Sequence, residues 1–116
     1  MMRQFLIAIL LAMSSPAFAV SPESEGFHRL SASHIAQAFT GKTFSDDTHF
    51  SFRYRPKGLI EGMSMGRKVE NKWRVEKDLL CETSRTGESC YSVWKKGQAV
   101  RLVVDGTEVI IDGFLR

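Results

Sequence analysis

Apolar and polar residues alternate along much of the chain, and this pattern predicts β-strands. The clearest example is residues 50–55, in which Phe50, Phe52 and Tyr54 alternate with a serine and two arginines. A period of two places successive side chains on opposite faces of a strand. Similar strand patterns occur over residues 59–65, 72–75, 79–83, 91–95, 98–104 and 107–111. Turn residues separate them at intervals typical of an all-β sandwich or barrel.

One segment ahead of these strands has a helical pattern instead. Over residues 30–41, Ile35 and Phe39 are four residues apart and therefore share one face of a helix. Ser31 is suited to the N-cap position, and Gly41 is suited to ending the helix in a left-handed conformation. A helix of about two turns is not stable alone. We therefore expect it to pack over one end or edge of the sheet.

These elements predict a mainly β fold, with a short N-terminal helix followed by an antiparallel meander of seven or eight strands. The meander forms a small barrel or a strongly curved sheet. The strand segments are too closely spaced for crossover helices, which argues against a parallel sheet. Asp105 and Gly106 form the strongest hairpin signal, whereas Gly62 weakens its strand or marks a bulge. Residues 30–116 contain no linker or repeat, so we expect a single domain there.

The first 19 residues have the layout of a secretory signal. A short basic start is followed by nine consecutive apolar residues (5–13), and Ala17 and Ala19 are the small residues of a cleavage site. Nine apolar residues are too few to span a bilayer, which needs about 20; an uncleaved anchor is the alternative interpretation. Cleavage after Ala19 predicts a periplasmic or secreted protein without a transmembrane segment in its mature chain. Residues 20–29 are polar and predict a flexible leader.

Export changes the interpretation of the two cysteines. Eight residues separate Cys81 from Cys90, so a hairpin could bring both sulfur atoms within bonding distance. In an oxidising compartment such a pair usually forms a disulfide. Closing so small a loop stabilises a fold by about 2.5–3 kcal/mol. A redox pair or a metal thiolate site is the alternative, but the spacing is not Cys-x-x-Cys and no histidine lies nearby.

Composition and motifs indicate a protein that is neither an enzyme nor a nucleic-acid-binding protein. The formal net charge is +3 and 25% of the residues are charged, which is too mild for a nucleic-acid partner. None of the common nucleophile, phosphate-binding or zinc motifs is present, so no catalytic residue and no cofactor is predicted. Asp46, Asp47 and His49 could supply metal ligands or a proton relay. Aspartates are also favoured in ordinary turns, and we predict no metal site.

Two groups of side chains are candidates for binding. The first is aromatic and is expected to meet on the concave face of the sheet, where it would line a pocket for a small apolar ligand or fill the core. Its members are Phe52, Tyr54, Trp73 and Trp94. The second is basic and, on neighbouring strands, would form an outward patch for an anionic envelope component. Its members are Arg53, Arg55, Lys72 and Arg74, which a solvated strand face also explains.

Several segments resemble known families. Residues 72–81 (Lys-Trp-Arg-Val-Glu-Lys-Asp-Leu-Leu-Cys), together with Cys90 and Tyr91, resemble small secreted bacterial proteins of unknown function. In these a short helix precedes a disulfide-bridged β meander. Residues 91–99 (Tyr-Ser-Val-Trp-Lys-Lys-Gly-Gln-Ala) are similar to periplasmic lysozyme-inhibitor barrels. The Ser-Gly-x-x-Tyr stretch that would enter a lysozyme cleft is missing here, and the nearest match is residues 87–91.

The expected function is that of an exported, non-enzymatic binding or envelope-associated module. The aromatic group predicts a small apolar ligand, and the basic group predicts an anionic envelope partner. The alternative is a lysozyme-inhibitor-like protein that binds its partner through the hairpin between Cys81 and Cys90. The ligand, the oligomeric state and the strand order are not determined by these patterns.

Overall fold

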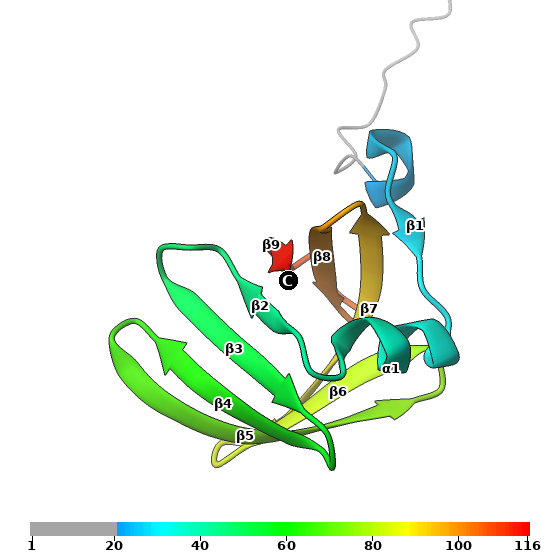
Figure 1. The fold of residues 1–116 in the computed structure, drawn as a ribbon. Coiled ribbons are helices and arrows are strands. Elements are labelled where there is room, and N and C mark those ends of the chain that lie inside the picture. The colour runs from blue at the N-terminus through cyan, green and yellow to red at the C-terminus, as the bar shows by residue number, and fades with distance from the viewer. Residues whose placement is uncertain (1–20) are drawn as a thin grey trace, which may run out of the picture.

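Eight strands close into an antiparallel barrel, and one short helix lies across one end of it (Figure 1). This computed structural model describes residues 21–116, and the predicted signal segment, residues 1–19, lies outside them. From β2 to β9 each strand pairs with the next one in the chain, and β9 pairs with β2 to close the barrel. The predicted fold class is confirmed. The barrel strands are β2 (Thr43–Ser45), β3 (Phe50–Arg55), β4 (Leu59–Ser64), β5 (Arg67–Glu76), β6 (Leu79–Ser84), β7 (Gly87–Lys96), β8 (Ala99–Val104) and β9 (Ile110–Leu115).

The segment predicted as a leader carries two short elements before the barrel. It contains the 3-10 helix η1 (Pro22–Glu25) and the strand β1 (His28–Arg29), which pairs with the second half of β7. The guanidinium of Arg101 holds this segment against the barrel. It lies 4.7 Å from the centre of the Phe27 ring and forms an ion pair with Glu25. The contacts with Arg101 join segments about 75 residues apart, so the composition of residues 20–29 gives no signal for them.

The helix α1 (Ala32–Phe39) closes one end of the barrel with its apolar face. Ile35 and Phe39 are fully buried there, as their four-residue spacing predicts. Ser31 occupies the N-cap position, but its hydroxyl bonds to the Nδ1 atom of His34 rather than capping the helix. The first free N–H group, that of Ala32, donates instead to Asp78 in the turn between β5 and β6, at 2.8 Å. The helix is therefore attached to the barrel at both its apolar face and its N-terminus.

The barrel interior is filled by alternate residues of the strands. Strand pairing places Phe44, Phe52 and Gly62 next to one another on the interior side, and Tyr54 beside Ile60 in the next row. The fully buried core is apolar apart from the Tyr54 hydroxyl. Its members are Ile35, Phe39, Phe44, Tyr54, Ile60, Leu80, Val93, Val100, Leu102 and Leu115.

Several strand details differ from the prediction. β5 begins at Arg67 rather than at residue 72, and β7 begins at Gly87 rather than at residue 91. The ladder between β3 and β4 is continuous through Gly62, so this glycine does not mark a bulge. The last strand begins at Ile110 rather than at Thr107. The turn that begins at Asp105 and Gly106 continues through residue 109. The Thr107 hydroxyl donates to the Val104 carbonyl and accepts from the Val109 N–H group. Thr107 is thereby held in the turn.

Candidate binding site

The four aromatic residues predicted to face a ligand do not share one surface. Phe52, Tyr54 and Trp73 point into the barrel, where Trp73 packs edge-on against Tyr54 with ring centres 5.6 Å apart. Trp94 lies on the outer face, because it alternates with the buried Val93 and its indole N–H donates to Ser92 two residues away. Three of the four therefore contribute to core packing, and Trp94 is separate from them.

A carboxyl group that the sequence analysis did not single out lies inside the barrel. Glu82 of β6 faces the interior opposite Trp73, and it accepts a hydrogen bond from the Tyr54 hydroxyl. Burial raises the pKa of Glu82, although the bond from Tyr54 acts in the opposite direction. Burial and the nearby Glu82 raise the pKa of Tyr54 well above its usual value. The pair is thus a neutral hydrogen-bonded unit over a wider pH range than free side chains would allow.

The stability of the barrel should depend on the protonation of Glu82. In the unfolded chain this group loses its proton near pH 4.5, whereas the folded protein retains it to higher pH. The free energy of unfolding should therefore fall as the pH rises from 4.5 through the folded-state pKa. We expect Glu82→Gln to remove this component, since the amide oxygen still accepts from Tyr54. Urea unfolding of both proteins between pH 4 and 8 measures the difference, and parallel pH profiles would contradict it.

The predicted basic patch is divided by an intervening strand. β3 carries Arg53 and Arg55, β5 carries Lys72 and Arg74, and β4 pairs with both strands and separates them. The β4 residue between Arg53 and Glu70 is Glu61, which also forms an ion pair with Arg55 at 3.0 Å. A continuous patch would require β3 and β5 to be neighbours, and they are not.

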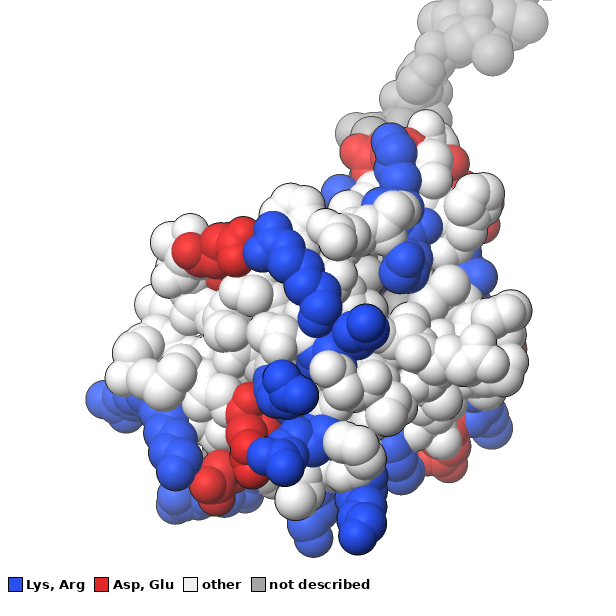
Figure 2. Space-filling view, in the orientation of Figure 1, with Lys and Arg blue, Asp and Glu red and all other residues white. Residues whose placement is uncertain are grey.

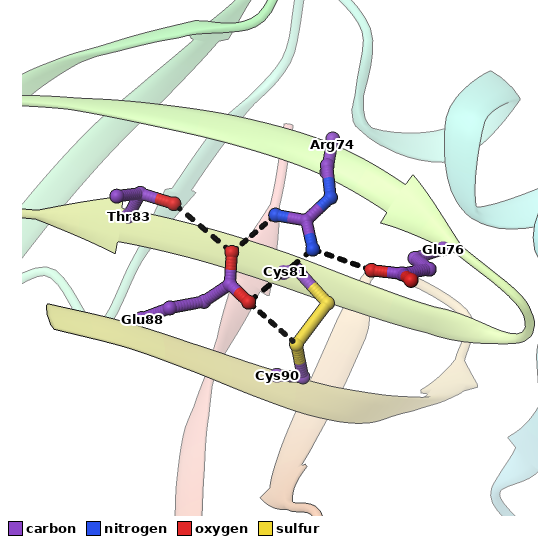
Figure 3. The surroundings of a disulfide bond; sticks show 6 residues. All are labelled: Arg74, Glu76, Cys81, Thr83, Glu88 and Cys90. Atoms are coloured by element: carbon purple, nitrogen blue, oxygen red, sulfur yellow. Dashed lines mark hydrogen bonds and ion pairs between the residues drawn. A yellow bond between two sulfur atoms is a disulfide. The ribbon is translucent and has the colours of Figure 1, made fainter.

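The two cysteines form a disulfide directly across the β6–β7 ladder, with Cα atoms 4.0 Å apart. The Arg74 side chain extends from β5 over this bond, where it pairs with Glu88 and Glu76 (Figure 3). Thr83 also donates to Glu88, at 3.2 Å. These ion pairs raise the pKa of Arg74 and lower that of Glu88. The cluster covers the disulfide.

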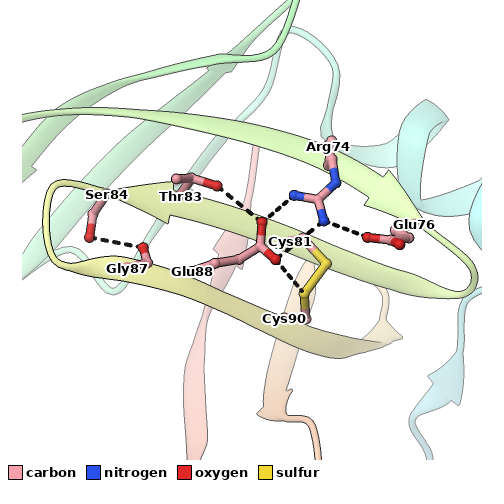
Figure 4. Close-up of polar contacts among 8 residues, drawn as sticks. All are labelled: Arg74, Glu76, Cys81, Thr83, Ser84, Gly87, Glu88 and Cys90. Atoms are coloured by element: carbon pink, nitrogen blue, oxygen red, sulfur yellow. Dashed lines mark hydrogen bonds and ion pairs between the residues drawn. A yellow bond between two sulfur atoms is a disulfide. The ribbon is translucent and has the colours of Figure 1, made fainter.

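The hairpin between the cysteines is a regular ladder up to a tight turn. β6 and β7 pair as far as Ser84 and Gly87, and the Ser84 hydroxyl donates to the Gly87 carbonyl at the turn (Figure 4). The segment considered for insertion into a lysozyme cleft is therefore paired strand rather than a projecting loop. The predicted disulfide is confirmed.

The residues from Asp46 to His49 form a turn held by one carboxylate. One Asp46 oxygen accepts from the N–H groups of Thr48, His49 and Phe50, and the other bonds to the His49 ring at 2.7 Å. Desolvation opposes ionisation of Asp46, but these four hydrogen bonds outweigh it and hold its pKa well below the usual range. Across residues 21–116, no group of three or more histidine, cysteine, aspartate or glutamate side chains is placed to hold a metal ion.

A surface groove of about 650 Å³ lies between α1 and the end of β9. We call it the α1 groove. One wall is the side of the helix that carries the exposed His34 and Gln37 and the half-buried Ala38, which also packs against the core. The remaining lining residues come from four further segments of the chain. They are Leu30, Lys42, Lys95, Gln98, Leu115 and Arg116.

The α1 groove is cationic. Lys42, Lys95 and Arg116 line it, and no aspartate or glutamate in the described part of the chain (residues 21–116) does so. Arg116 pairs with Asp47 at 3.0 Å. Among residues 21–116, no carboxylate lies within 4 Å of the Lys42 or Lys95 ammonium group. Basic side chains gather between α1 and the C-terminal end of β9 on the face shown in Figure 2.

Sequence reasoning missed the α1 groove because its cations are far apart in the chain. Lys42 follows α1, Lys95 is the second-last residue of β7, and Arg116 follows β9. The only local signal is the polar face of α1, formed by His34 and Gln37 opposite Ile35 and Phe39. Such a face is equally typical of a helix exposed to solvent.

The fold and the groove define a helix-capped, eight-stranded antiparallel barrel with a cationic surface groove. No known protein family matches the chain, and neither a characterised protein nor a solved structure was found to be similar to it. Within residues 21–116, none of the helices has both the length and the apolar composition needed to cross a membrane.

Proposed function

We propose that this protein is an exported, non-enzymatic binding module that holds a small anionic ligand in the α1 groove. The observation that carries this proposal is the convergence of Lys42, Lys95 and Arg116 on one hollow, which no aspartate or glutamate of residues 21–116 lines. Among residues 21–116, Lys42 and Lys95 have no carboxylate within 4 Å, whereas Arg116 also pairs with Asp47. An anion in the groove compensates the charge of the two lysines. The groove volume of about 650 Å³ is also in the range of small-molecule sites.

The remaining lining residues favour an amphipathic ligand. Leu30, Ala38 and Leu115 provide apolar surface, while Gln37 and Gln98 provide amide groups that donate and accept hydrogen bonds. A ligand with a carboxylate or phosphate group next to a short hydrocarbon part matches both kinds of surface. His34 also lines the groove, and in this proposal it binds the anion together with the lysines.

Export is supported by the disulfide and by the sequence of the first 19 residues. The Cys81–Cys90 bond forms and persists in an oxidising compartment. An anionic component of a bacterial envelope, such as a lipid or glycan bearing phosphate, has the required chemistry. In this proposal the α1 groove replaces the divided patch on β3 and β5 as the anion-binding surface.

Binding of short anionic amphiphiles tests the proposal. We expect octanoate or octyl phosphate to bind, and octanol, which lacks the charge, to bind about tenfold more weakly. The double variant Lys42→Ala, Lys95→Ala should lose about tenfold or more in affinity for the anions, because two charge-assisted contacts are removed. Isothermal titration calorimetry at low and high salt measures both effects.

A matched pair of exposed lysines provides the control. Lys57 and Lys72 lie away from the α1 groove, and the variant Lys57→Ala, Lys72→Ala has the same change in net charge. We expect it to bind the anions as the unmodified protein does. Equal loss in the two double variants would mean that net charge, rather than the α1 groove, attracts the ligand. Equal binding of octanol and octanoate would refute an anion site.

A further inference from the structure

The barrel is closed by an unusually short pairing. β2 has three residues, and only Phe44 and Ser45 pair with β9, opposite Leu115 and Phe114. Asp47 then adopts a left-handed conformation with φ of 64°, and the chain turns away from the ladder. The first half of β9 therefore pairs with β8 on one side, and no strand within residues 21–116 pairs with it on the other.

The register shows which main-chain groups remain free along β9. Arg116 and Thr43 exchange two hydrogen bonds across the closing pair, so the even-numbered residues of β9 direct their N–H and C=O groups toward β2. By this alternation the same groups of Ile110 and Asp112 point past the end of β2. Among residues 21–116, neither residue has a main-chain hydrogen bond on that side. We call these groups the β9 edge.

Apolar side chains flank the β9 edge on the outside of the barrel. Val109, Ile110 and Phe114 are 58%, 39% and 42% exposed, which is high for large apolar side chains. A hollow of about 260 Å³ lies beside Phe114, which lines it together with Asp112. Free strand edges next to exposed apolar residues are sites at which another extended chain adds as a strand.

The charges around the β9 edge are mainly negative. Asp46 and Asp112 line the adjacent hollow together with Arg101, and Asp105 and Glu108 lie in the turn that leads into β9. Arg101 pairs with Asp112, but within residues 21–116 no cation lies within 4 Å of the Asp105 or Glu108 carboxylate. A partner that bears lysine or arginine is therefore electrostatically complementary to this edge.

We propose that the β9 edge binds an extended, basic segment of a partner protein as an added antiparallel strand. Ile110 and Asp112 together offer four main-chain hydrogen bonds to it. Ile110 and Phe114 contact its apolar side chains, and the acidic residues around the edge select lysine or arginine. Ile110 and Asp112 are not among the residues that line the α1 groove. The β9 edge is therefore a separate, protein-binding surface, and it goes beyond the function proposed above.

A blocked peptide of about eight residues with alternating valine and lysine is a suitable probe. In nuclear magnetic resonance titrations of the folded protein, we expect it to shift the amide signals of Ile110 and Asp112 and to slow their hydrogen exchange about tenfold. Ile110→Pro should weaken binding about tenfold, because it removes an N–H group that faces the partner. The fold should be retained, since proline is tolerated where the N–H group of an edge strand has no partner.

Charge variants keep the test decisive if the proline variant does not fold. Glu108→Lys should weaken binding of the lysine peptide several-fold, whereas Glu70→Lys on β5 makes the same change of charge far from β9 and should not. A peptide with glutamate in place of lysine should bind at least several-fold more weakly. The proposal is overturned if the lysine peptide leaves the Ile110 and Asp112 signals unchanged, or if the edge instead pairs two copies of this chain.

Discussion

Replacing Phe39 with alanine is expected to lower the free energy of unfolding by about 3–5 kcal/mol. The Phe39 side chain is fully buried, and its ring lies edge-on to Tyr54 with centres 4.9 Å apart. It also packs against Phe44, so its removal opens a cavity between α1 and two barrel strands. Small domains are stable by only about 5–15 kcal/mol in total, so this loss should be evident in both urea and thermal unfolding.

Gln37→Ala is the matched control for this prediction. Gln37 lies on the same helix but on its exposed face, and its replacement should change the free energy of unfolding by less than about 0.5 kcal/mol. Similar losses in the two variants would contradict a specific contribution of the buried Phe39 side chain, since alanine has a higher helix propensity than either residue it replaces. Phe39→Ala should also weaken anion binding, because the α1 wall of the groove is held in place by the buried face of the same helix.

Gly62→Ala is expected to cost more than about 3 kcal/mol, or to prevent folding. A Cβ atom added at Gly62 would lie 1.9 Å from the Ser51 carbonyl oxygen and 2.9 Å from the Phe52 Cα atom. Both contacts are with the backbone of β3, so no side-chain rotation relieves them, and the two strands would have to separate. Circular dichroism and urea unfolding of the purified variant measure the effect.

Gly66→Ala separates this close approach from an ordinary glycine effect. Gly66 has φ of 80°, but an added Cβ atom there meets no other atom within 4 Å. The variant should lose only about 1 kcal/mol, the cost of placing alanine in a left-handed conformation. If Gly62→Ala were no more costly than Gly66→Ala, the close packing of β3 against β4 at this position would be contradicted.

Local sequence patterns predict most helices and strands of this fold, because the formation of each element depends on residues close to one another in the chain. The alternation of Phe50, Phe52 and Tyr54 requires only that one face of a strand be buried, and the structure buries that face. The spacing of Cys81 and Cys90 matches the two sides of a hairpin, where they form the disulfide. In contrast, alternation does not determine which face is interior, and Trp94 was therefore placed on the wrong side of β7.

The sequence by itself determined a disulfide-bridged antiparallel meander with one helix, since periodicity, turn residues and cysteine spacing act over about ten residues. The tertiary structure alone decided how the barrel closes, because the pairing of β2 with β9 joins segments about 70 residues apart and stops after two residues on each strand. It also brought Lys42, Lys95 and Arg116 into one groove and left the main-chain groups of Ile110 and Asp112 free. The α1 groove forms at the C-terminal end of β9, and the β9 edge forms at its N-terminal end, which extends beyond β2. Both surfaces depend on long-range contacts, which leave no periodic signal in the sequence.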